Sequence, residues 1–288
     1  MPLITPFDPW KNKHCTCPSK YSLSAYTGCN HGCLYCYASS YIRNFSHPRP
    51  KKDFLKRLET QIEKIPKNSI ITMANSSDPY QGLEEKLQLS RKILIILKDF
   101  DLRLNIVTKS PLIVRDIDLL SKFKNITISF TLTSLDAKVA KRIEPFLNYT
   151  PQEKLKAISI LFKNIPVAVR FDPLIYPLNT ENIKETIKAL KKSGAKQIIT
   201  STYKTKPDNF RRMSNAFPEY AELWKTLYLE KGEKINGYNY LPLALRIKII
   251  EEVRKTTLSE GMEFSSCREG FSELNTANCD GTLLTTNK

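Results

Sequence analysis

The sequence predicts an α/β fold: a partial six-stranded (β/α)6 barrel of parallel strands, with an N-terminal arm and a C-terminal helical extension. Three observations support this. Short apolar runs of strand length alternate with amphipathic segments of about ten residues. That alternation is typical of parallel βα units. The six repeats that we count fall short of a closed eight-fold barrel.

The predicted strands lie at residues 20–26, 70–74, 102–107, 126–132, 166–171 and 197–200. Helical spacing of apolar residues is found at 52–65, 87–97, 117–123, 153–162 and 182–192. Pro66 and Gly194 end two of these helices. Because the carboxyl ends of parallel strands meet at one edge, we expect the residues that follow each strand to share one rim.

The chain divides into three regions. Residues 1–20 are rich in proline and polar residues without a period, and we expect them to form an arm. Residues 21–204 contain the repeated strand and helix units. After about residue 205 the alternation stops, and residues 205–288 hold an aromatic segment and an amphipathic helix at 241–258. We expect this last region to be a helical extension that closes one side of the barrel.

Composition favours a soluble protein of the cytoplasm. Hydrophobic residues make up 41% and charged residues 26% of the chain. No apolar stretch is long enough to span a bilayer, and the N-terminus lacks the pattern of a signal peptide. The 7 cysteines are an odd number, which favours metal ligation in a reducing compartment over a disulfide framework. Oligomeric state is left open.

The chain carries a large positive charge, with 45 Lys and Arg against 29 Asp and Glu and a net charge of +16. Such a charge favours a polyanionic partner such as nucleic acid. The alternative is a lysine-rich surface that serves solvation, as in thermophilic proteins. Charge alone does not decide between them.

The most informative stretch is residues 28–37, where Cys29, Cys33 and Cys36 have Cys-x3-Cys-x2-Cys spacing. Three thiolates leave one iron of a [4Fe-4S] cluster without a protein ligand, and that iron is open to chemistry. Gly28 and Gly32 let the backbone wrap closely around an inorganic core. Zinc is the alternative, but it needs a fourth ligand nearby.

This motif resembles the signature of the radical SAM superfamily. The resemblance implies that the open iron binds S-adenosylmethionine, with Tyr35 beside the adenine. It also implies reductive cleavage of that cofactor to methionine and a 5′-deoxyadenosyl radical, with the protein supplying orientation and exclusion of water. An electron donor of the ferredoxin or flavodoxin type is implied as a partner.

Further motifs resemble the spore photoproduct lyase-like group, also described as DNA repair photolyase-like, over nearly the whole chain. They are Tyr35-Cys36-Tyr37 and the segments 75–81, 108–110, 142–145 and 267–270. The resemblance implies that Tyr35 and Tyr37 are catalytic and relay a hydrogen atom together with a cysteine at the exit of strand two. Here Asn75 matches that cysteine, and an amide cannot donate a hydrogen atom as a thiol can.

The same resemblance implies that Ser77, Lys109 and Thr131 contact the cofactor. Lys109 follows a strand, where its charge can pair with the methionyl carboxylate; the alternative is a solvated lysine. Asp78 either binds a ribose or substrate hydroxyl or begins a turn before Pro79.

Two arginines are further candidates for cofactor binding. Arg142 and Glu144 either face the cofactor or pair with each other. Arg170 ends the fifth predicted strand, where it either points to the rim or anchors the barrel.

Four cysteines remain: Cys15, Cys17, Cys267 and Cys279. Four thiols are the full ligand set of a second iron–sulfur cluster or of a zinc ion. A shared site requires that the two ends of the chain meet. The alternatives are separate buried thiols or disulfides.

The sequence is therefore compatible with three functions. The first is a radical SAM enzyme that acts on nucleic acid. The second is a radical SAM enzyme that acts on a peptide or a small metabolite, since one fold serves many reactions. The third is a metal-stabilised nucleic-acid-binding protein without enzymatic activity. The polar residues gathered at one rim argue against the third.

Overall fold

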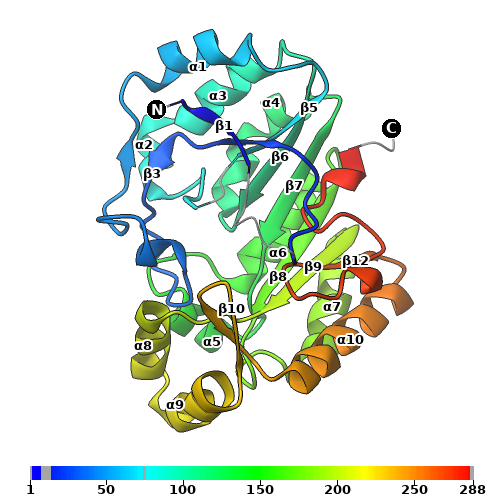
Figure 1. Cartoon of the computed structure of the whole chain (residues 1–288). Helices are drawn as coiled ribbons and strands as arrows, with labels where there is room; N and C mark the ends of the chain where they lie inside the picture. Colours follow the sequence, from blue (N-terminus) through cyan, green and yellow to red (C-terminus); the bar gives the residue numbers. More distant parts are fainter. Residues whose placement is uncertain (1, 8–13, 74–75, 286–288) are drawn as a thin grey trace.

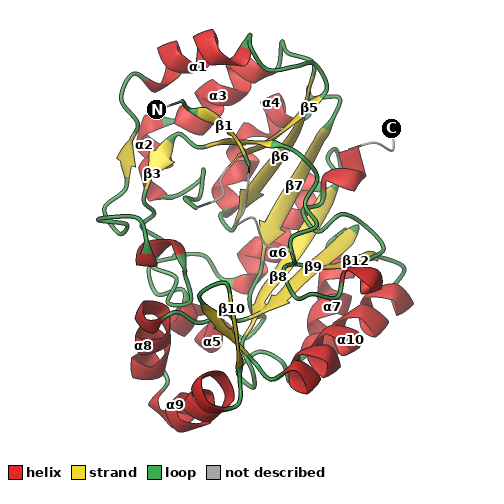
Figure 2. Cartoon of the chain, in the orientation of Figure 1, coloured by secondary structure: helices red, strands yellow, loops and turns green. Residues whose placement is uncertain are grey.

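The computed structural model describes residues 2–7, 14–73 and 76–285, so Asn75 of the predicted site lies outside the described residues. One sheet organises the molecule, and its strand order is β1-β2-β5-β6-β7-β8-β9-β12 (Figures 1 and 2). These strands span Ile4–Pro6, Tyr21–Leu23, Ser69–Met73, Leu102–Thr108, Ile126–Thr131, Val167–Leu174, Gln197–Thr202 and Glu263–Ser266. From β2 to β12 each neighbour is parallel, and only β1 is antiparallel.

The predicted α/β fold with an open parallel sheet is confirmed, with two differences. The first predicted strand, 20–26, is divided: β2 joins the sheet, whereas β3 (Tyr26–Thr27) pairs with β4 (Arg49–Pro50). β12 lies in the region expected to be only helical, and it extends the sheet beyond β9. The boundary proposed at residue 204 stays a prediction, and the sheet crosses it.

Helices flank the sheet in the expected alternation. They are α1 (Phe54–Ile62), α2 (Gly82–Leu87), α3 (Leu89–Leu97), α4 (Ile117–Leu120), α5 (Ala137–Ile143), α6 (Pro151–Leu161) and α7 (Ile183–Lys192). α6 starts with a capping box, in which the Thr150 side chain binds the Glu153 N–H and the Glu153 side chain binds the Thr150 N–H. α7 ends before Gly194, which has a φ of 96°.

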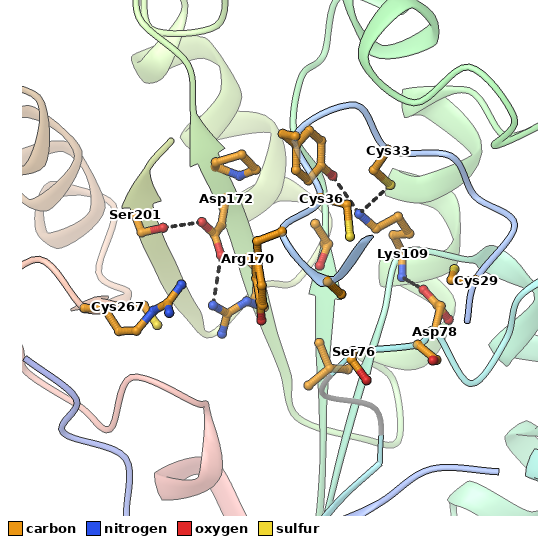
Figure 3. A pocket seen from close by; sticks show the side chains of 18 of the residues that line it. Cys29, Cys33, Cys36, Ser76, Asp78, Lys109, Arg170, Asp172, Ser201 and Cys267 are labelled. Carbon is orange, nitrogen blue, oxygen red and sulfur yellow. Dashed lines mark hydrogen bonds and ion pairs between the residues drawn. The ribbon is translucent and has the colours of Figure 1, made fainter. Parts of the chain in front are cut away.

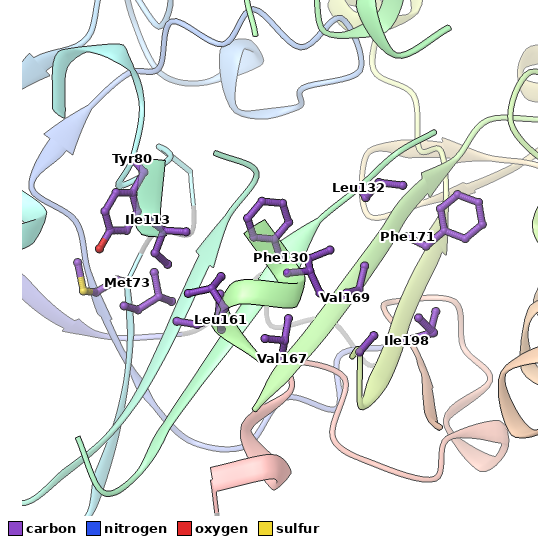
Figure 4. Close-up of a cluster of buried hydrophobic side chains, with 14 of the residues drawn as sticks. Met73, Tyr80, Ile113, Phe130, Leu132, Leu161, Val167, Val169, Phe171 and Ile198 are labelled. Carbon is purple, nitrogen blue, oxygen red and sulfur yellow. The ribbon is translucent and has the colours of Figure 1, made fainter. Parts of the chain in front are cut away.

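Alternation along the strands separates an apolar face from a polar interior. In β7, Ile126, Ile128 and Phe130 belong to the hydrophobic core, whereas the intervening Thr127, Ser129 and Thr131 are buried polar residues. Successive side chains of a strand point to opposite faces, so one face packs under the helices and the other lines the interior. Figure 4 shows the apolar side from Met73 to Ile198. The polar side is where a functional site can form.

The C-terminal region is a mixed extension and not a purely helical one. It contains α8 (Pro207–Ala216), α9 (Pro218–Lys225), the hairpin of β10 (Glu233–Ile235) and β11 (Tyr238–Tyr240), and α10 (Leu243–Ser259). α10 packs against α7 and against β9 and β12. Within the described residues, no helix has the length and apolar character needed to cross a membrane.

The two ends of the chain meet. In Figure 1 the N-terminal segment, in blue, crosses the open side of the sheet and reaches the C-terminal tail, in red. The Sγ atoms of Cys17 and Cys279 are 3.6 Å apart, and Lys20 forms a buried ion pair with Asp280. This geometry satisfies the condition that a shared site of the four remaining cysteines requires.

A buried arginine ties the extension together. Arg246 of α10 donates to the Glu269 carbonyl at 2.9 Å, to Glu269 Oε2 at 3.3 Å and to Glu233 Oε2 at 2.8 Å. Its side chain is 2% exposed. Removing one partner of a buried ion pair leaves an uncompensated charge, which is strongly destabilising.

We therefore expect Arg246→Met to lower the free energy of unfolding by about 3–5 kcal/mol, measured by urea denaturation. Lys248→Met, on an exposed position of the same helix, is the matched control and should stay within about 0.5 kcal/mol of the parent. Equal midpoints for the two variants would contradict the role given to Arg246.

Candidate active site

The cysteine loop follows β3 and is held by backbone bonds on both sides. The Cys29 N–H donates to the Phe45 carbonyl at 2.8 Å, and the Leu34 N–H donates to the Ile143 carbonyl at 2.9 Å. Gln81 clamps the start of the loop, because its Nε2 donates to the Gly28 carbonyl at 3.1 Å. The loop is therefore fixed by segments far from it in the sequence.

Helix α8 holds the end of the same loop. Arg212 donates to the carbonyls of Cys33 and Cys36 at 3.2 and 2.7 Å. Asn209 Nδ2 donates to the Tyr35 carbonyl at 3.1 Å. Sequence reasoning missed these two residues, because a carbonyl-binding side chain some 170 residues away leaves no local pattern.

Glycines allow the loop its tight course. Gly28 has a φ of 85°, and a Cβ there would lie 2.5 Å from the Phe45 carbonyl oxygen. Gly32 has a φ of 64°, and its Cβ would lie 2.2 Å from the Phe146 ring. Both positions need glycine for conformation and for space, as predicted from the sequence.

A buried charge cluster stands beside the loop. Lys109 Nζ, at the end of β6, donates to Cys33 Sγ at 3.3 Å, to the Tyr35 hydroxyl at 2.6 Å and to Glu144 Oε1 at 3.3 Å. Tyr35 also donates to Glu144. Lys154 of α6 donates to the second carboxylate oxygen, Oε2, at 2.7 Å. Lys109 is therefore a site residue and not a solvated surface lysine.

The charges in this cluster are fixed by their neighbours. Burial opposes ionisation of Glu144, but Lys154 and Lys109 hold the pKa of the carboxyl well below its ordinary value. Burial also opposes the charge of Lys109, and Cys33, Tyr35 and Glu144 raise its pKa well above the ordinary value. Two ammonium groups face the Glu144 carboxylate, and the Asp78 carboxylate accepts from the Lys109 N–H, so the cluster contains two cations and two carboxylates.

Asp78 makes the bonds of a turn. Its Oδ1 accepts from the Tyr80 N–H at 2.9 Å and from the Thr108 hydroxyl at 2.6 Å, and its Oδ2 accepts from the Lys109 N–H at 2.9 Å. The bond to Tyr80 is that of a turn, and the other two link the turn to the end of β6. Asp78 also lines the cavity described below, so its role in binding a hydroxyl stays a prediction. Its effect on the site is to hold the end of β6, and with it Lys109.

The strand ends and the cysteine loop face one cavity of ≈ 510 Å³. Ser77 and Thr131 line it, as does His31 of the loop. Ser77 Oγ and His31 Nδ1 are buried and have no hydrogen-bond partner among the described residues. His31 Nδ1 lies 3.6 Å from Asp78 Oδ2 and so faces a carboxylate. Buried polar atoms usually have partners, so the Ser77 hydroxyl is available to a bound group.

The far side of the cavity is formed by later strands (Figure 3). Arg170 of β8 donates to Asp172 Oδ2 at 2.9 Å, and the Ser201 hydroxyl donates to Asp172 Oδ1 at 2.6 Å. Burial opposes ionisation of Asp172, but Arg170 holds its pKa below the ordinary value. Arg170 also donates to Cys267. Arg170 thus reaches the rim and lines the cavity.

Arg142 corrects the prediction. Its guanidinium donates to Glu219 at 2.6 and 3.0 Å and to the Ala216 carbonyl at 2.7 Å, and the side chain is 44% exposed. It neither lines the cavity nor pairs with Glu144. The two residues are separated by Ile143, the last residue of α5, and their contacts lie with different partners.

The two tyrosines that flank Cys36 lie in different surroundings. Tyr35 is hydrogen-bonded in the Lys109 cluster. The Tyr37 ring stacks on Tyr41 with centroids 6.3 Å apart and meets the Tyr238 ring edge-on at the same distance. Both line the cavity. A role for them in hydrogen-atom transfer stays a prediction.

A family model described as the radical SAM superfamily matches residues 23–190, which include the cysteine loop and the strand ends of the cavity. The chain belongs to the radical SAM superfamily. Membership, together with the site just described, indicates an enzyme whose family uses a [4Fe-4S] cluster and S-adenosylmethionine.

Two relatives of this radical SAM protein are described as uncharacterized proteins. Protein MJ0683 of Methanocaldococcus jannaschii is 31% identical over 150 residues, which cover 51% of this chain and 56% of that protein. ORF301 of Acidianus two-tailed virus is 26% identical over 247 residues, which cover 76% of this chain and 80% of that protein. The chain thus spans little more than half of the first relative.

Solved structures share the fold. A spore photoproduct lyase variant with bound AdoMet and dinucleoside spore photoproduct has a TM-score of 0.67 at 18% identity, covering 88% of this chain and 76% of the lyase. Streptococcus suis SuiB bound to the precursor peptide SuiA has a TM-score of 0.52 at 15% identity, covering 85% of this chain and 48% of SuiB. The fold is spore photoproduct lyase-like.

The residues present fit the family's cofactors. The thiols of Cys29, Cys33 and Cys36 share one loop, and the loop has two glycines where a Cβ would collide. Ser77 Oγ is unpartnered in the same cavity, and Lys109 supplies a cation beside Cys33. These residues would hold the cluster and the anionic end of S-adenosylmethionine.

The glycine requirement is testable with a matched pair. Gly28→Ala and Gly237→Ala both place alanine at positive φ, at a shared cost of about 1–2 kcal/mol. Only at Gly28 does the new Cβ also meet backbone, whereas nothing lies within 4 Å at Gly237. We expect Gly28→Ala to reduce iron content after anaerobic reconstitution at least twofold and Gly237→Ala to leave it unchanged. Equal iron contents in the two variants would contradict the requirement for glycine at position 28.

Proposed function

We propose that this protein reductively cleaves S-adenosylmethionine at a [4Fe-4S] cluster held by Cys29, Cys33 and Cys36. The observation that carries the proposal is the position of these thiols. They share one cavity with the strand-end residues Ser77, Lys109 and Thr131. The chemistry that the bound cofactors supply is one-electron cleavage of a carbon–sulfur bond to methionine and a 5′-deoxyadenosyl radical.

The protein's own contribution is positioning, charge and exclusion of water. Lys109, held by Asp78 and Glu144, presents a fixed cation to a carboxylate. Arg212 and Gln81 immobilise the cysteine loop. A one-electron donor of the ferredoxin or flavodoxin type is the partner that this reaction needs.

We propose nucleic acid as the substrate class. Two features support it: the net charge of +16 and a fold shared with a lyase bound to a dinucleoside photoproduct. The alternative is a peptide, and the fold shared with SuiB bound to its precursor peptide is the observation that favours it. Both alternatives keep the same cofactor chemistry.

Cleavage of the cofactor is tested with Cys33→Ala. The variant should lose the open-iron cluster and, with it, at least about 100-fold of the 5′-deoxyadenosine formed after chemical reduction, measured by chromatography. Ser121→Ala, at an exposed position outside the cavity, is the control and should match the parent. A Cys33→Ala protein that still forms 5′-deoxyadenosine would refute the proposed function.

The substrate class is tested by binding of a short single-stranded and a double-stranded DNA at several salt concentrations. If nucleic acid binds, the logarithm of the affinity should fall linearly with the logarithm of salt, because phosphate contacts release counterions. An uncharged peptide of similar mass is the control ligand. Absence of DNA and RNA binding at low salt would overturn this substrate class and favour the peptide.

A further inference from the structure

Four cysteines that the proposed reaction does not use gather at one place. The Sγ atoms of Cys17 and Cys279 are 3.6 Å apart. Cys15 lies close enough to Cys17, and Cys267 close enough to Cys279, for each pair to shift the pKa of its thiols. All four are free thiols, and two come from each end of the chain. Separate buried thiols would not need to come together from two distant segments, whereas the ligands of a shared metal site would.

The sheet fixes the backbone at the two tail cysteines. Cys267 follows β12, and its N–H donates to the Thr200 carbonyl at 2.8 Å. Cys279 precedes Asp280, whose carbonyl accepts from Asn105 Nδ2 at 2.6 Å and from Ser129 Oγ at 3.0 Å. These donors belong to β6 and β7. The tail thiols are therefore held by strands, and Cys17 of the arm contacts them at Cys279.

Cations lie near the set. Lys20, which pairs with Asp280, lies near Cys17 and Cys279. Arg170, which pairs with Asp172, and Arg268 lie near Cys267. Four thiolates around a divalent ion carry a net charge of about −2, and nearby cations stabilise that charge when it is buried.

We propose that Cys15, Cys17, Cys267 and Cys279 bind a second metal centre of the four-thiolate type. A zinc ion and an iron–sulfur cluster share this donor chemistry. Within the described residues, no three His, Cys, Asp or Glu side chains are already arranged to hold one metal ion. The same is true of Cys29, Cys33 and Cys36. At both centres the thiol side chains would rotate onto the metal from a fixed backbone.

The second centre would stand opposite the first. Both cysteine sets line the same cavity: the cysteine loop follows β3, and Cys267, after β12, lies across the cavity from it (Figure 3). A metal there would crosslink the arm to the tail and form one wall of the space in which a substrate lies. This inference stands independently of S-adenosylmethionine cleavage.

The test uses the full chain with Cys29, Cys33 and Cys36 all changed to serine, purified without oxygen. Iron, zinc and acid-labile sulfide are counted per chain. We expect retention of about four iron atoms with sulfide, or of about one zinc ion without it. Adding Cys17→Ser and Cys267→Ser should remove that metal, whereas adding Ser19→Ala, in the same arm, should not.

A second measurement does not depend on the folding of variants. In the native parent protein, thiol alkylation followed by mass spectrometry should show the four cysteines protected until a chelator is added. Retention of either metal, with this protection, supports the proposal. A metal-free triple variant, alkylation without chelator, or a Cys17–Cys279 disulfide in anaerobic protein would overturn it. None of these measurements depends on S-adenosylmethionine cleavage, so they test the second metal centre separately from the proposed function.

Discussion

The site depends on one buried carboxylate. Glu144 lies between Lys109 and Lys154 and accepts from Tyr35, so it joins the end of β6, helix α6 and the cysteine loop. Buried charges are tolerated only when they are paired and hydrogen-bonded, and here each ammonium group has the carboxylate as a partner. The pairing with Glu144 holds the Lys109 ammonium group 3.3 Å from Cys33 Sγ. A thiolate-bound cluster or a cofactor carboxylate would be stabilised by that cation.

The topology of the sheet determines what meets this cluster. The parallel strands bring Thr108, Thr131 and Arg170 to one rim, although they are spread over some sixty residues of sequence. Alternation within each strand directs apolar side chains to the helices and polar ones to the interior. The interior is therefore a lined cavity with a cysteine set at each side. The chain ends complete it, because Lys20 of the arm forms a buried ion pair with Asp280 of the tail, where blue and red segments lie side by side in Figure 1.

Much of this followed from local patterns, and what did not follow depends on long-range contacts. The parallel strands, the cysteine loop and the glycine positions each have a sequence signal of their own. β12 has none: Glu263–Ser266 is short and polar, and it is a strand because β9 pairs with it and Gln197 Nε2 donates to Ser265 at 2.8 Å. Lys154 resembles any helical lysine until Glu144 lies beside it. Arg142 shows the reverse. Its place in the motif at residues 142–145 suggested a role in the site, but its side chain contacts Glu219.

The net positive charge of the chain is not concentrated in the cavity. Four of the cations that line it each have a carboxylate partner: Lys20 pairs with Asp280, Lys109 with Glu144, Arg170 with Asp172 and Lys204 with Glu269. Buried charges are tolerated when they are paired in this way. The excess behind the net charge of +16 therefore comes mainly from residues outside the cavity. Salt-dependent binding of nucleic acid tests that outer charge, whereas metal content tests the two cysteine sets.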